Sequence, residues 1–414
     1  MAMTSASHPS RRLGGFDATT VGIGSMIGAG VFVVFPPAAA SAGTLLPLAL
    51  LLAAIVAFCN AAATAQLAAI HPQSGGTYIY GRRQLGQWPG FIAGWSFVTG
   101  KTASCAAIAY TLGIYLLPGN ERAAAVAAVV VVTAINMLGI TRTAWATRII
   151  VSIVVAVLAF VLVVAFTSPA VSEVPTLSTS AYGVLQAAGL LFFAFAGYAR
   201  IATMGSEVHE PEKNIPRAVL GALGFTLGLY VLLALALTHS LGLDGLASSR
   251  APLLAVFGTA DDGVSTTAVT VAAVLACLGG LLALVAGIGR TVYAMASEGD
   301  LPAVMGRLGK RFHAPVIAEP LIAVIVIILI LTTDVLTVVG FSSFGVLLYY
   351  VITNASALTL GKRPWYAPRA LNVLGCTGCL LLAFTLPITS VLVMLAVLVV
   401  GILGRAVRLS VQRN

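Results

Sequence analysis

One stretch decides the fold, Gly22-Ile-Gly-Ser-Met-Ile-Gly-Ala-Gly-Val-Phe32, which holds four glycines within nine residues. It lies midway along an apolar segment, residues 16–42, that has the length of a membrane helix. So many glycines predict that the helix unwinds here, because glycine readily adopts non-helical backbone. A broken backbone at membrane depth must be satisfied by protein, water or a ligand, so such a break usually lines a cavity.

A second irregularity is Phe192-Phe-Ala-Phe-Ala-Gly-Tyr-Ala-Arg200, where Gly197 lies among aromatic residues. At the first break, the helix that resumes near Gly30 would direct its positive end at the membrane midplane, which suits a carboxylate. Carbonyl groups freed on the other side of the break suit an ammonium group. The alternative interpretation of each break is close helix packing through small residues.

The composition requires a lipid environment. Hydrophobic residues make up 59% of the 414 residues, charged residues make up 8%, and the mean hydropathy is +1.03. A soluble globule of this size would need more polar surface. Continuous apolar segments without the alternation of membrane strands predict an all-α polytopic protein with about twelve transmembrane helices. These span residues 16–42, 45–70, 89–117, 122–140, 146–167, 181–205, 217–240, 266–296, 316–332, 334–360, 369–385 and 387–407.

The two breaks fall in the first and sixth predicted helices, near residues 27 and 196. Because each repeat contains five helices, an odd number, the second repeat starts on the opposite side of the membrane and is inverted relative to the first. Paired broken helices at corresponding positions indicate a site at the midplane. The predicted units are a cytoplasmic N-terminus (1–15), a first repeat (16–167), an inverted second repeat (181–360), two further helices (369–407) and a cytoplasmic tail (408–414).

Positive charge predicts the orientation, because Lys and Arg accumulate in cytoplasmic loops. With the N-terminus inside, cytoplasmic segments contain 18 of the 22 Lys and Arg residues. We therefore expect a multi-pass protein of the inner (plasma) membrane with both termini in the cytoplasm. The same bias explains the net charge of +9 without a nucleic-acid partner.

Neither a metal nor a cofactor is expected. All five cysteines lie within apolar segments, and Cys376-Thr-Gly-Cys379 has no second pair of ligands. Helix packing is the favoured role for this pair. No nucleophile with a base, carboxylate pair or His/Asp/Glu cluster occurs at membrane depth, so we expect no catalytic residue and no enzyme.

Four motifs in this order resemble the amino acid-polyamine-organocation (APC) superfamily, over nearly the whole chain. They are Gly24-Ser-Met-Ile-Gly-Ala-Gly-Val-Phe32, Pro72-Gln-Ser-Gly-Gly-Thr-Tyr-Ile-Tyr80, the set Phe193, Phe195, Gly197, Tyr198, Glu207, Pro211, Ile215, Pro216 and Ala218, and Arg290-Thr-Val-Tyr-Ala-Met-Ala-Ser-Glu-Gly-Asp-Leu-Pro302. The resemblance implies the LeuT-type 5+5 inverted-repeat fold with its first and sixth helices broken. It also implies a secondary active transporter that moves an amino acid by alternating access.

The resemblance also implies the binding residues. Carried over by motif, the substrate would contact Ser25, Ile27, Gly28, Ala29 and Gly30 from the first helix and Phe193, Ala196 and Gly197 from the sixth. The aromatic ring of Phe193 would act as a gate. Many relatives have an acidic or amide residue directly after the Gly-Tyr pair, whereas this chain has Ala199 there, followed by Arg200, so the resemblance implies no gating role for a polar group at that position.

Two charged residues are candidates for coupling or gating. Lys101 lies 13 residues beyond Trp88, about 20 Å into the membrane at ~1.5 Å per residue. This depth favours a functional role, either as a cation that loses its proton with the access state or in place of a sodium ion. Arg200 is either an inner gate or a structural partner of Glu207 or Asp17. The segment 276–286 has no Ser/Thr pair of the sort that binds sodium in relatives, so proton-coupled symport or exchange is favoured.

The charges also bear on the cargo. No Asp or Glu lies at the predicted midplane, so a dicationic cargo would lack a counter-ion, and a neutral or anionic amino acid is favoured. The alternatives are an amine or organic-cation transporter of the same fold and a transport-inactive nutrient sensor. A proton is an expected partner besides the bilayer and the amino acid. The sequence leaves the oligomeric state open.

Overall fold

The computed structural model describes residues 13–71, 75–138, 144–171, 176–202, 208–258, 263–309, 315–364 and 366–413. Helices make up the regular structure of these residues, which contain no β-strand. The extended pairings found among them are two isolated bridges, Leu13 with Val208 and Leu308 with Pro315. The all-helical prediction is confirmed.

The helices follow the predicted segments closely. Their bounds are α1 (Gly15–Ile27), α2 (Gly30–Val33), α3 (Phe35–Ala42), η1 (Gly43–Leu45), α4 (Leu46–Ile70), α5 (Thr77–Gln84), α6 (Gln87–Leu116), α7 (Glu121–Met137), α8 (Ala144–Thr167), α9 (Ala181–Phe195), η2 (Ala196–Tyr198), α10 (Ala199–Ala202), α11 (Pro211–Ser248), α12 (Pro252–Ala255), α13 (Val264–Ser297), η3 (Ala303–Gly306), α14 (Ala318–Thr332), α15 (Val335–Leu358), α16 (Arg369–Phe384) and α17 (Ile388–Arg413).

Within the described residues, eight helical stretches are long and apolar enough to cross a membrane. Two further apolar helices, α14 and α16, are shorter, with 15 and 16 residues. Each of the twelve predicted segments coincides with helical structure, but only these eight meet the length and hydropathy expected of a span. The chain is therefore a multi-pass membrane protein, and its twelve-helix layout stays a prediction.

The largest difference in helix bounds concerns α11. The sequence predicts a helix over residues 217–240, from the length of its apolar stretch. The structure extends this helix to 38 residues and accommodates Gly242 as a kink with a φ of 68°. Pro211 occupies the first position of the helix, where an N–H group would have no partner within the helix, whereas Pro216 lies inside it.

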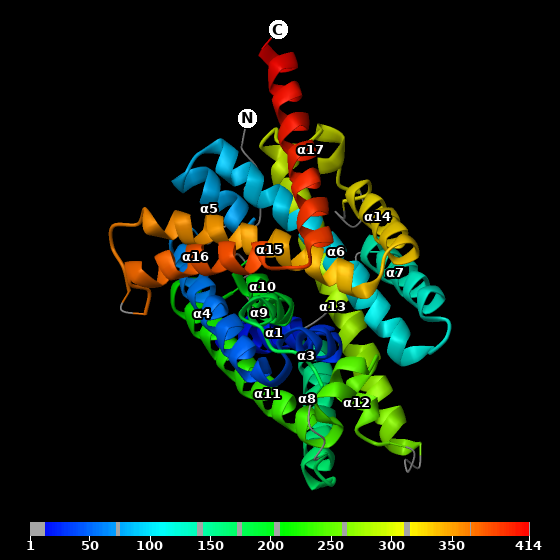
Figure 1. The fold of residues 1–414 in the computed structure, drawn as a ribbon. Helices are drawn as coiled ribbons and strands as arrows, with labels where there is room; N and C mark the ends of the chain where they lie inside the picture. Colours follow the sequence, from blue (N-terminus) through cyan, green and yellow to red (C-terminus); the bar gives the residue numbers. More distant parts are fainter. Residues whose placement is uncertain are drawn as a thin grey trace.

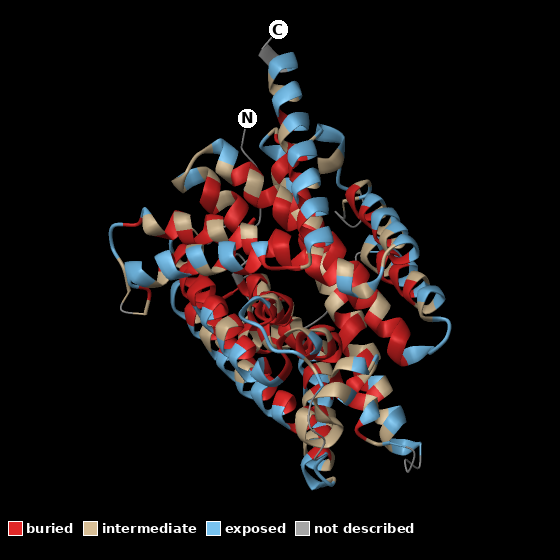
Figure 2. Cartoon of the chain, viewed as in Figure 1, coloured by how far each residue is buried: buried red, intermediate tan, exposed pale blue. Residues whose placement is uncertain are grey.

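The broken helices lie at the centre of the molecule (Figure 1). There α1, α3 and α9 are surrounded by α11 and α8 on one side and by α15 and α16 on the other. The long helix α6 packs against α15 and α13. Buried residues gather along these inner helices, whereas the outer faces are exposed (Figure 2).

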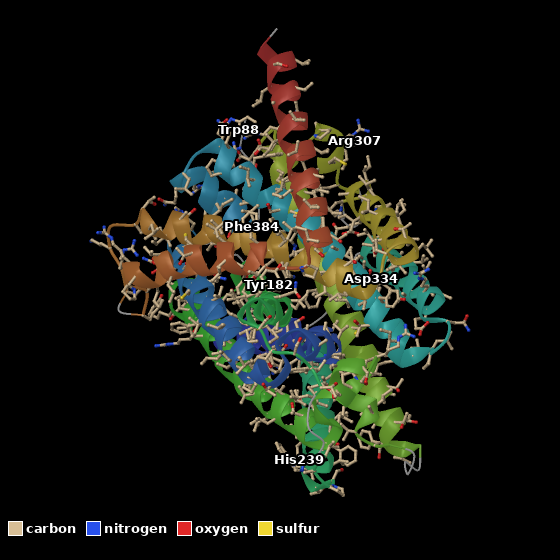
Figure 3. The ribbon with its side chains drawn as sticks, in the orientation of Figure 1. Trp88, Tyr182, His239, Arg307, Asp334 and Phe384 are labelled. Atoms are coloured by element: carbon tan, nitrogen blue, oxygen red, sulfur yellow. The ribbon has the colours of Figure 1, made fainter. Side chains whose placement is uncertain are left out.

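The exposed faces are apolar. Phe384 and Tyr182, for example, lie on the surface with 56% and 55% of their area exposed (Figure 3). Apolar area of this extent faces lipid in a membrane protein, where it carries no penalty.

Candidate functional site

The first predicted break is confirmed in the backbone. Helix α1 ends at Ile27, and Gly28 leaves helical geometry with φ 17° and ψ −128°. Ala29 is the N-cap residue of the short helix α2, which begins at Gly30. The sequence Gly-Ala-Gly therefore interrupts the helix where its glycine content predicted. Next to the break, the carbonyl oxygen of Met26 accepts a hydrogen bond from the hydroxyl of Tyr230, at 2.8 Å.

The second break is a change of helix type. Helix α9 ends at Phe195, and the chain continues through the 3-10 turn η2, which contains Gly197, into α10. The carbonyl oxygen of Ala194 also accepts a hydrogen bond from Tyr230, at 3.2 Å. One buried hydroxyl from α11 thus contacts both broken helices.

Most of the glycines allow close packing. A Cβ atom on Gly197 would collide with the carbonyl oxygen of Ser25, and one on Gly30 would lie 2.7 Å from the Cα of Ala194. A Cβ on Gly22 would collide with the side chain of Ile201. Gly28 differs, since such an atom would meet only the backbone of its own turn, the carbonyl oxygen of Ser25 at 3.5 Å being nearest. Both interpretations of the glycine-rich stretches therefore apply, each to different glycines. Gly28 forms the break in the helix, whereas Gly22, Gly30 and Gly197 allow close helix packing.

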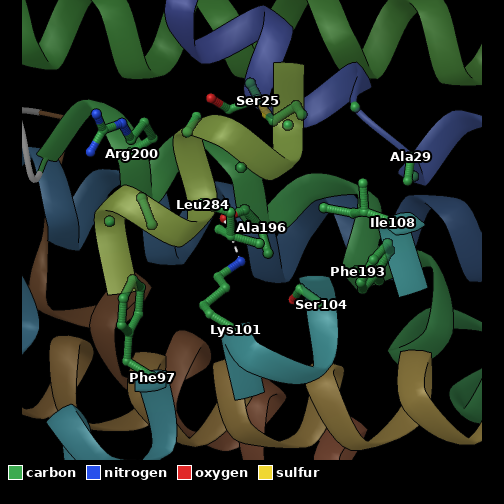
Figure 4. Close-up of a pocket in the computed structure, with 18 residues that line it drawn as sticks. Ser25, Ala29, Phe97, Lys101, Ser104, Ile108, Phe193, Ala196, Arg200 and Leu284 are labelled. Atoms are coloured by element: carbon green, nitrogen blue, oxygen red, sulfur yellow. Dashed lines mark hydrogen bonds between the residues drawn. The ribbon is translucent and has the colours of Figure 1, made fainter. Parts of the chain in front are cut away.

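A cavity lies where the two breaks meet α6 and α13 (Figure 4). Its volume of about 60 Å³ would hold about five water molecules at roughly 10–15 Å³ each. The lining residues are Ser25, Met26, Gly28, Ala29, Gly30, Phe97, Lys101, Ser104, Ile108, Phe193, Ala196, Gly197, Ala199, Arg200, Gly280, Ala283, Leu284 and Gly287.

Seven of the eight residues predicted to bind substrate line this cavity, as do both charged candidates, Lys101 and Arg200. The eighth, Ile27, is buried but does not line it. Phe193 and Ile108 lie to one side of Lys101 in the view of Figure 4, and Phe97 and Arg200 lie to the other. The substrate-binding and gating roles of these residues stay predictions.

Lys101 extends from α6 into the cavity and is 6% exposed. Its ammonium group donates a hydrogen bond to the carbonyl oxygen of Ala196, at 3.4 Å (Figure 4). This distance is longer than the usual 2.7–3.2 Å, so the bond is weak. Nearby, the hydroxyl groups of Ser104 and Ser342 form a 2.5 Å hydrogen bond between α6 and α15.

Arg200 lines the cavity from α10 and faces α13, where a Cβ atom on Gly287 would lie 3.8 Å from its guanidinium. Of its two expected partners, Asp17 pairs with Arg148, whose Nε donates to the carboxylate at 2.7 Å. The proposed pairing of Arg200 with Asp17 stays a prediction. Glu207 lies outside the described residues, as do Pro72, Gln73 and Ser74 of the second motif.

The sequence did not predict a group of polar and charged side chains around the buried Asp300, which we call the Asp300 cluster: Tyr78, Arg82, Asp300 and Arg405. Asp300 is 6% exposed and accepts hydrogen bonds from Tyr78 and Arg82 at 2.7 Å each. Arg405 of α17 pairs with the other carboxylate oxygen at 2.8 Å. Its guanidinium also lies 4.4 Å from the centre of the Trp88 ring.

The Asp300 cluster joins three distant segments: α5, the turn after α13, and α17. Burial raises the pKa of the Tyr78 hydroxyl far above its ordinary value, and its hydrogen bond to Asp300 raises it further. The hydroxyl therefore remains a donor at any physiological pH. Two of the recognised motifs carry Tyr78 and Asp300, but only long-range contact brings Arg405 to them.

Two other groups bear on the sequence predictions. Cys379 lies 3.3 Å from the side-chain oxygen of Asn60, in agreement with a packing role for the Cys376 and Cys379 pair. Among the described residues, no group of three His, Cys, Asp or Glu could hold a metal ion. Glu319, at the start of α14, is a 3% exposed carboxylate that the sequence did not single out, and it does not line the cavity.

Comparisons with known proteins agree with this architecture. The family model described as Amino acid permease matches residues 13–414. An uncharacterized transporter of Mycobacterium tuberculosis (strain ATCC 25618 / H37Rv) is 49% identical over 98% of this chain and 92% of its own length. The branched-chain amino acid permease BcaP of Bacillus subtilis (strain 168) is 25% identical over 89% of this chain and 84% of its own. The chloroplastic cationic amino acid transporter 7 of Arabidopsis thaliana is 26% identical over 86% of this chain and 67% of its own.

Proposed function

The chain belongs to the amino acid permease family, and from that premise we propose that it moves a neutral or anionic amino acid across the membrane by alternating access. Its family and the names of its relatives identify a transporter and not an enzyme. The proposal includes the LeuT-type 5+5 arrangement, with repeats over residues 16–167 and 181–360, and an inner-membrane location with both termini in the cytoplasm.

One observation carries the proposal: the two broken segments, predicted from their glycines, meet at a single cavity lined by Ser25, Gly28 and Gly30 from one break and Ala196 and Gly197 from the other. Broken helices at membrane depth supply backbone groups that can bind a carboxylate and an ammonium group. An amino acid carries both groups on one carbon atom. The cavity is therefore suited to the common part of every amino acid.

The charge of the cavity favours a neutral or anionic cargo over a cationic one. Among the described residues that line it, two are cationic, Lys101 and Arg200, and none is Asp or Glu. A cargo with an additional positive charge would meet like charge in a medium of low dielectric constant. The named relatives include transporters of branched-chain and of cationic amino acids, so family membership alone leaves the cargo open.

For the coupling ion we propose a proton, moved by symport, or an exchange of cargo without an ion. The α13 wall of the cavity consists of Gly280, Ala283, Leu284 and Gly287, which offer no hydroxyl oxygen for sodium. Lys101, with its weak hydrogen bond, is a group that could change protonation as access changes. The proposed functional role of Lys101 is therefore in coupling.

Uptake by purified protein in liposomes tests this function. We expect saturable uptake of a radiolabelled amino acid under an inward proton gradient, unaffected by the removal of sodium, and loss of that uptake in Lys101→Ala. If no amino acid is taken up while an amine is, the cargo assignment is wrong. If uptake requires sodium, the proton coupling is wrong.

A further inference from the structure

Lys101 is a charged side chain at the centre of the proposed binding site, and its hydrogen-bond partner is informative. The ammonium group donates to the carbonyl oxygen of Ala196, the first residue of the η2 turn. The structure thus shows which backbone acceptor in the cavity binds an ammonium group. The α-ammonium of a cargo would compete with Lys101 for this same oxygen.

We infer that Lys101 is a specificity-determining residue that selects cargo with both an ammonium group and a carboxylate. The cargo ammonium group replaces that of Lys101 at the carbonyl oxygen of Ala196, and the cargo carboxylate then pairs with Lys101. This inference rests on the proposed function, since it concerns how an amino acid binds in that cavity. It assigns recognition of the cargo carboxylate to one side chain, Lys101.

The requirement follows from charge. Among the described lining residues there is no carboxylate, so Lys101 has only a neutral carbonyl as its partner within the cavity. If a cargo ammonium group takes the Ala196 oxygen, two positive charges lie within a few ångströms of each other in a dry site. A carboxylate on the cargo relieves this repulsion by pairing with Lys101, and an unpaired buried charge is strongly unfavourable otherwise.

The weakness of the existing bond makes the exchange feasible. At 3.4 Å, the bond between Lys101 and Ala196 is long. The lysine side chain has four rotatable carbon–carbon bonds, so its ammonium can move within the cavity without a change in α6. Ser104 lies one turn further along α6 and also lines the cavity.

Three ligands that differ by one group test the inference: an amino acid that wild type binds, its decarboxylated amine and its deaminated acid. For L-leucine these are isopentylamine and isocaproate. Wild type should bind the amino acid most tightly, the acid less tightly, and the amine at least roughly 100-fold more weakly than the amino acid, as sites that require a polar group reject analogues lacking it. Binding is measured by displacement of the radiolabelled amino acid from purified protein.

The variant Lys101→Met keeps the length of the side chain and removes the charge. It should lose affinity for the acid and bind the amine within about tenfold of the amino acid. The matched control is Lys362→Met, which removes an exposed lysine in the connection between α15 and α16 and should retain the wild-type order. Lys101→Gln serves as a second variant if Lys101→Met does not fold.

The outcomes separate the inference from the proposed function. If wild type binds the amino acid but binds the amine more tightly than the acid, the inference is wrong and the transport function stands. The same holds if the folded Lys101 variants still reject the amine. If wild type binds no amino acid at all, the proposed function fails and the inference fails with it.

Discussion

The cavity and the Asp300 cluster both contain a buried cation, but the two regions differ in how strongly that cation is paired. Arg82 and Arg405 are each bonded to Asp300 at 2.7–2.8 Å, and Arg405 also stacks on an aromatic ring. Lys101 has one 3.4 Å bond to a neutral carbonyl. A buried charge that is paired with a counter-ion stabilises one arrangement of the chain, whereas a weakly bonded one is available to a ligand. We therefore expect the Asp300 cluster to stabilise the fold and Lys101 to take part in binding the cargo.

The largest effect should come from removing the carboxylate of the Asp300 cluster. Asp300→Asn leaves the buried Arg405 without its counter-ion, and breaking such a pair costs about 3–5 kcal/mol. We expect a markedly lower Tm in detergent, measured by thermal unfolding. Glu298→Gln is the control, because that side chain is 49% exposed and its pair with Arg82 contributes little. Equal Tm values for the two variants would contradict the comparison.

The next largest effect concerns the contact between the broken helices. In Gly197→Ala, the added methyl group collides with the backbone of Ser25, and overpacking of this kind costs about 1–3 kcal/mol. Because this contact also forms the cavity wall, binding of the amino acid should be lost even where the protein remains folded. Gly224→Ala on α11 is the control, since nothing lies within 4 Å of its added atom. Unchanged binding in Gly197→Ala would show that the two helices are free to separate.

A smaller effect is expected from Tyr230→Phe, which removes the hydroxyl that binds Met26 and Ala194 and leaves the ring in place. The hydroxyl has one proton, which the two carbonyl oxygens share, so its loss predicts a destabilisation of about 1 kcal/mol. The dissociation constant for the amino acid should also rise, because both breaks lose support. Tyr293→Phe, at an exposed tyrosine of α13, should alter neither quantity. A variant that loses stability without a change in affinity would assign Tyr230 to the fold alone.

The smallest effect on stability should come from Lys101→Met. Replacing a poorly paired buried charge by an apolar side chain of similar length is neutral or stabilising, so we expect a change of less than about 1 kcal/mol or an increase in Tm. The measurement is the same thermal unfolding that is used for Asp300→Asn. A large loss of stability would mean that Lys101 stabilises the fold, as Arg405 does. The comparison between the cavity and the Asp300 cluster would then be wrong.

Much of the architecture could be predicted from the sequence, because membrane helices and glycine-rich breaks depend on local composition. The interruptions at Gly28 and Gly197 and the position of Lys101 in the cavity follow from pattern and depth along a helix. Ile27, which the motif places among the binding residues, does not line the cavity. It is adjacent to a break, but neighbouring residues of a helix point in directions about 100° apart, at 3.6 residues per turn, and motif membership does not fix that rotation.

Contacts between distant segments could not be predicted. Arg405 reaches Asp300 from a helix that the sequence assigned only to the end of the chain, and the pairing of Asp17 with Arg148 was not predicted. Several acidic and basic residues are available at each side of the membrane. Their pairing depends on packing geometry, which charge and periodicity do not contain.

The three glycine contacts between the broken helices have a consequence for engineering the transporter. Gly22 of α1, Gly30 of α2 and Gly197 of η2 are each in contact with the opposite broken segment, so neither segment can accept a larger residue at those points. The walls formed by α6 and α13 contribute Phe97, Ile108 and Leu284, which are side chains of ordinary size. Selection for larger or smaller cargo should therefore yield changes on these two walls, while the glycine side of the cavity keeps its sequence.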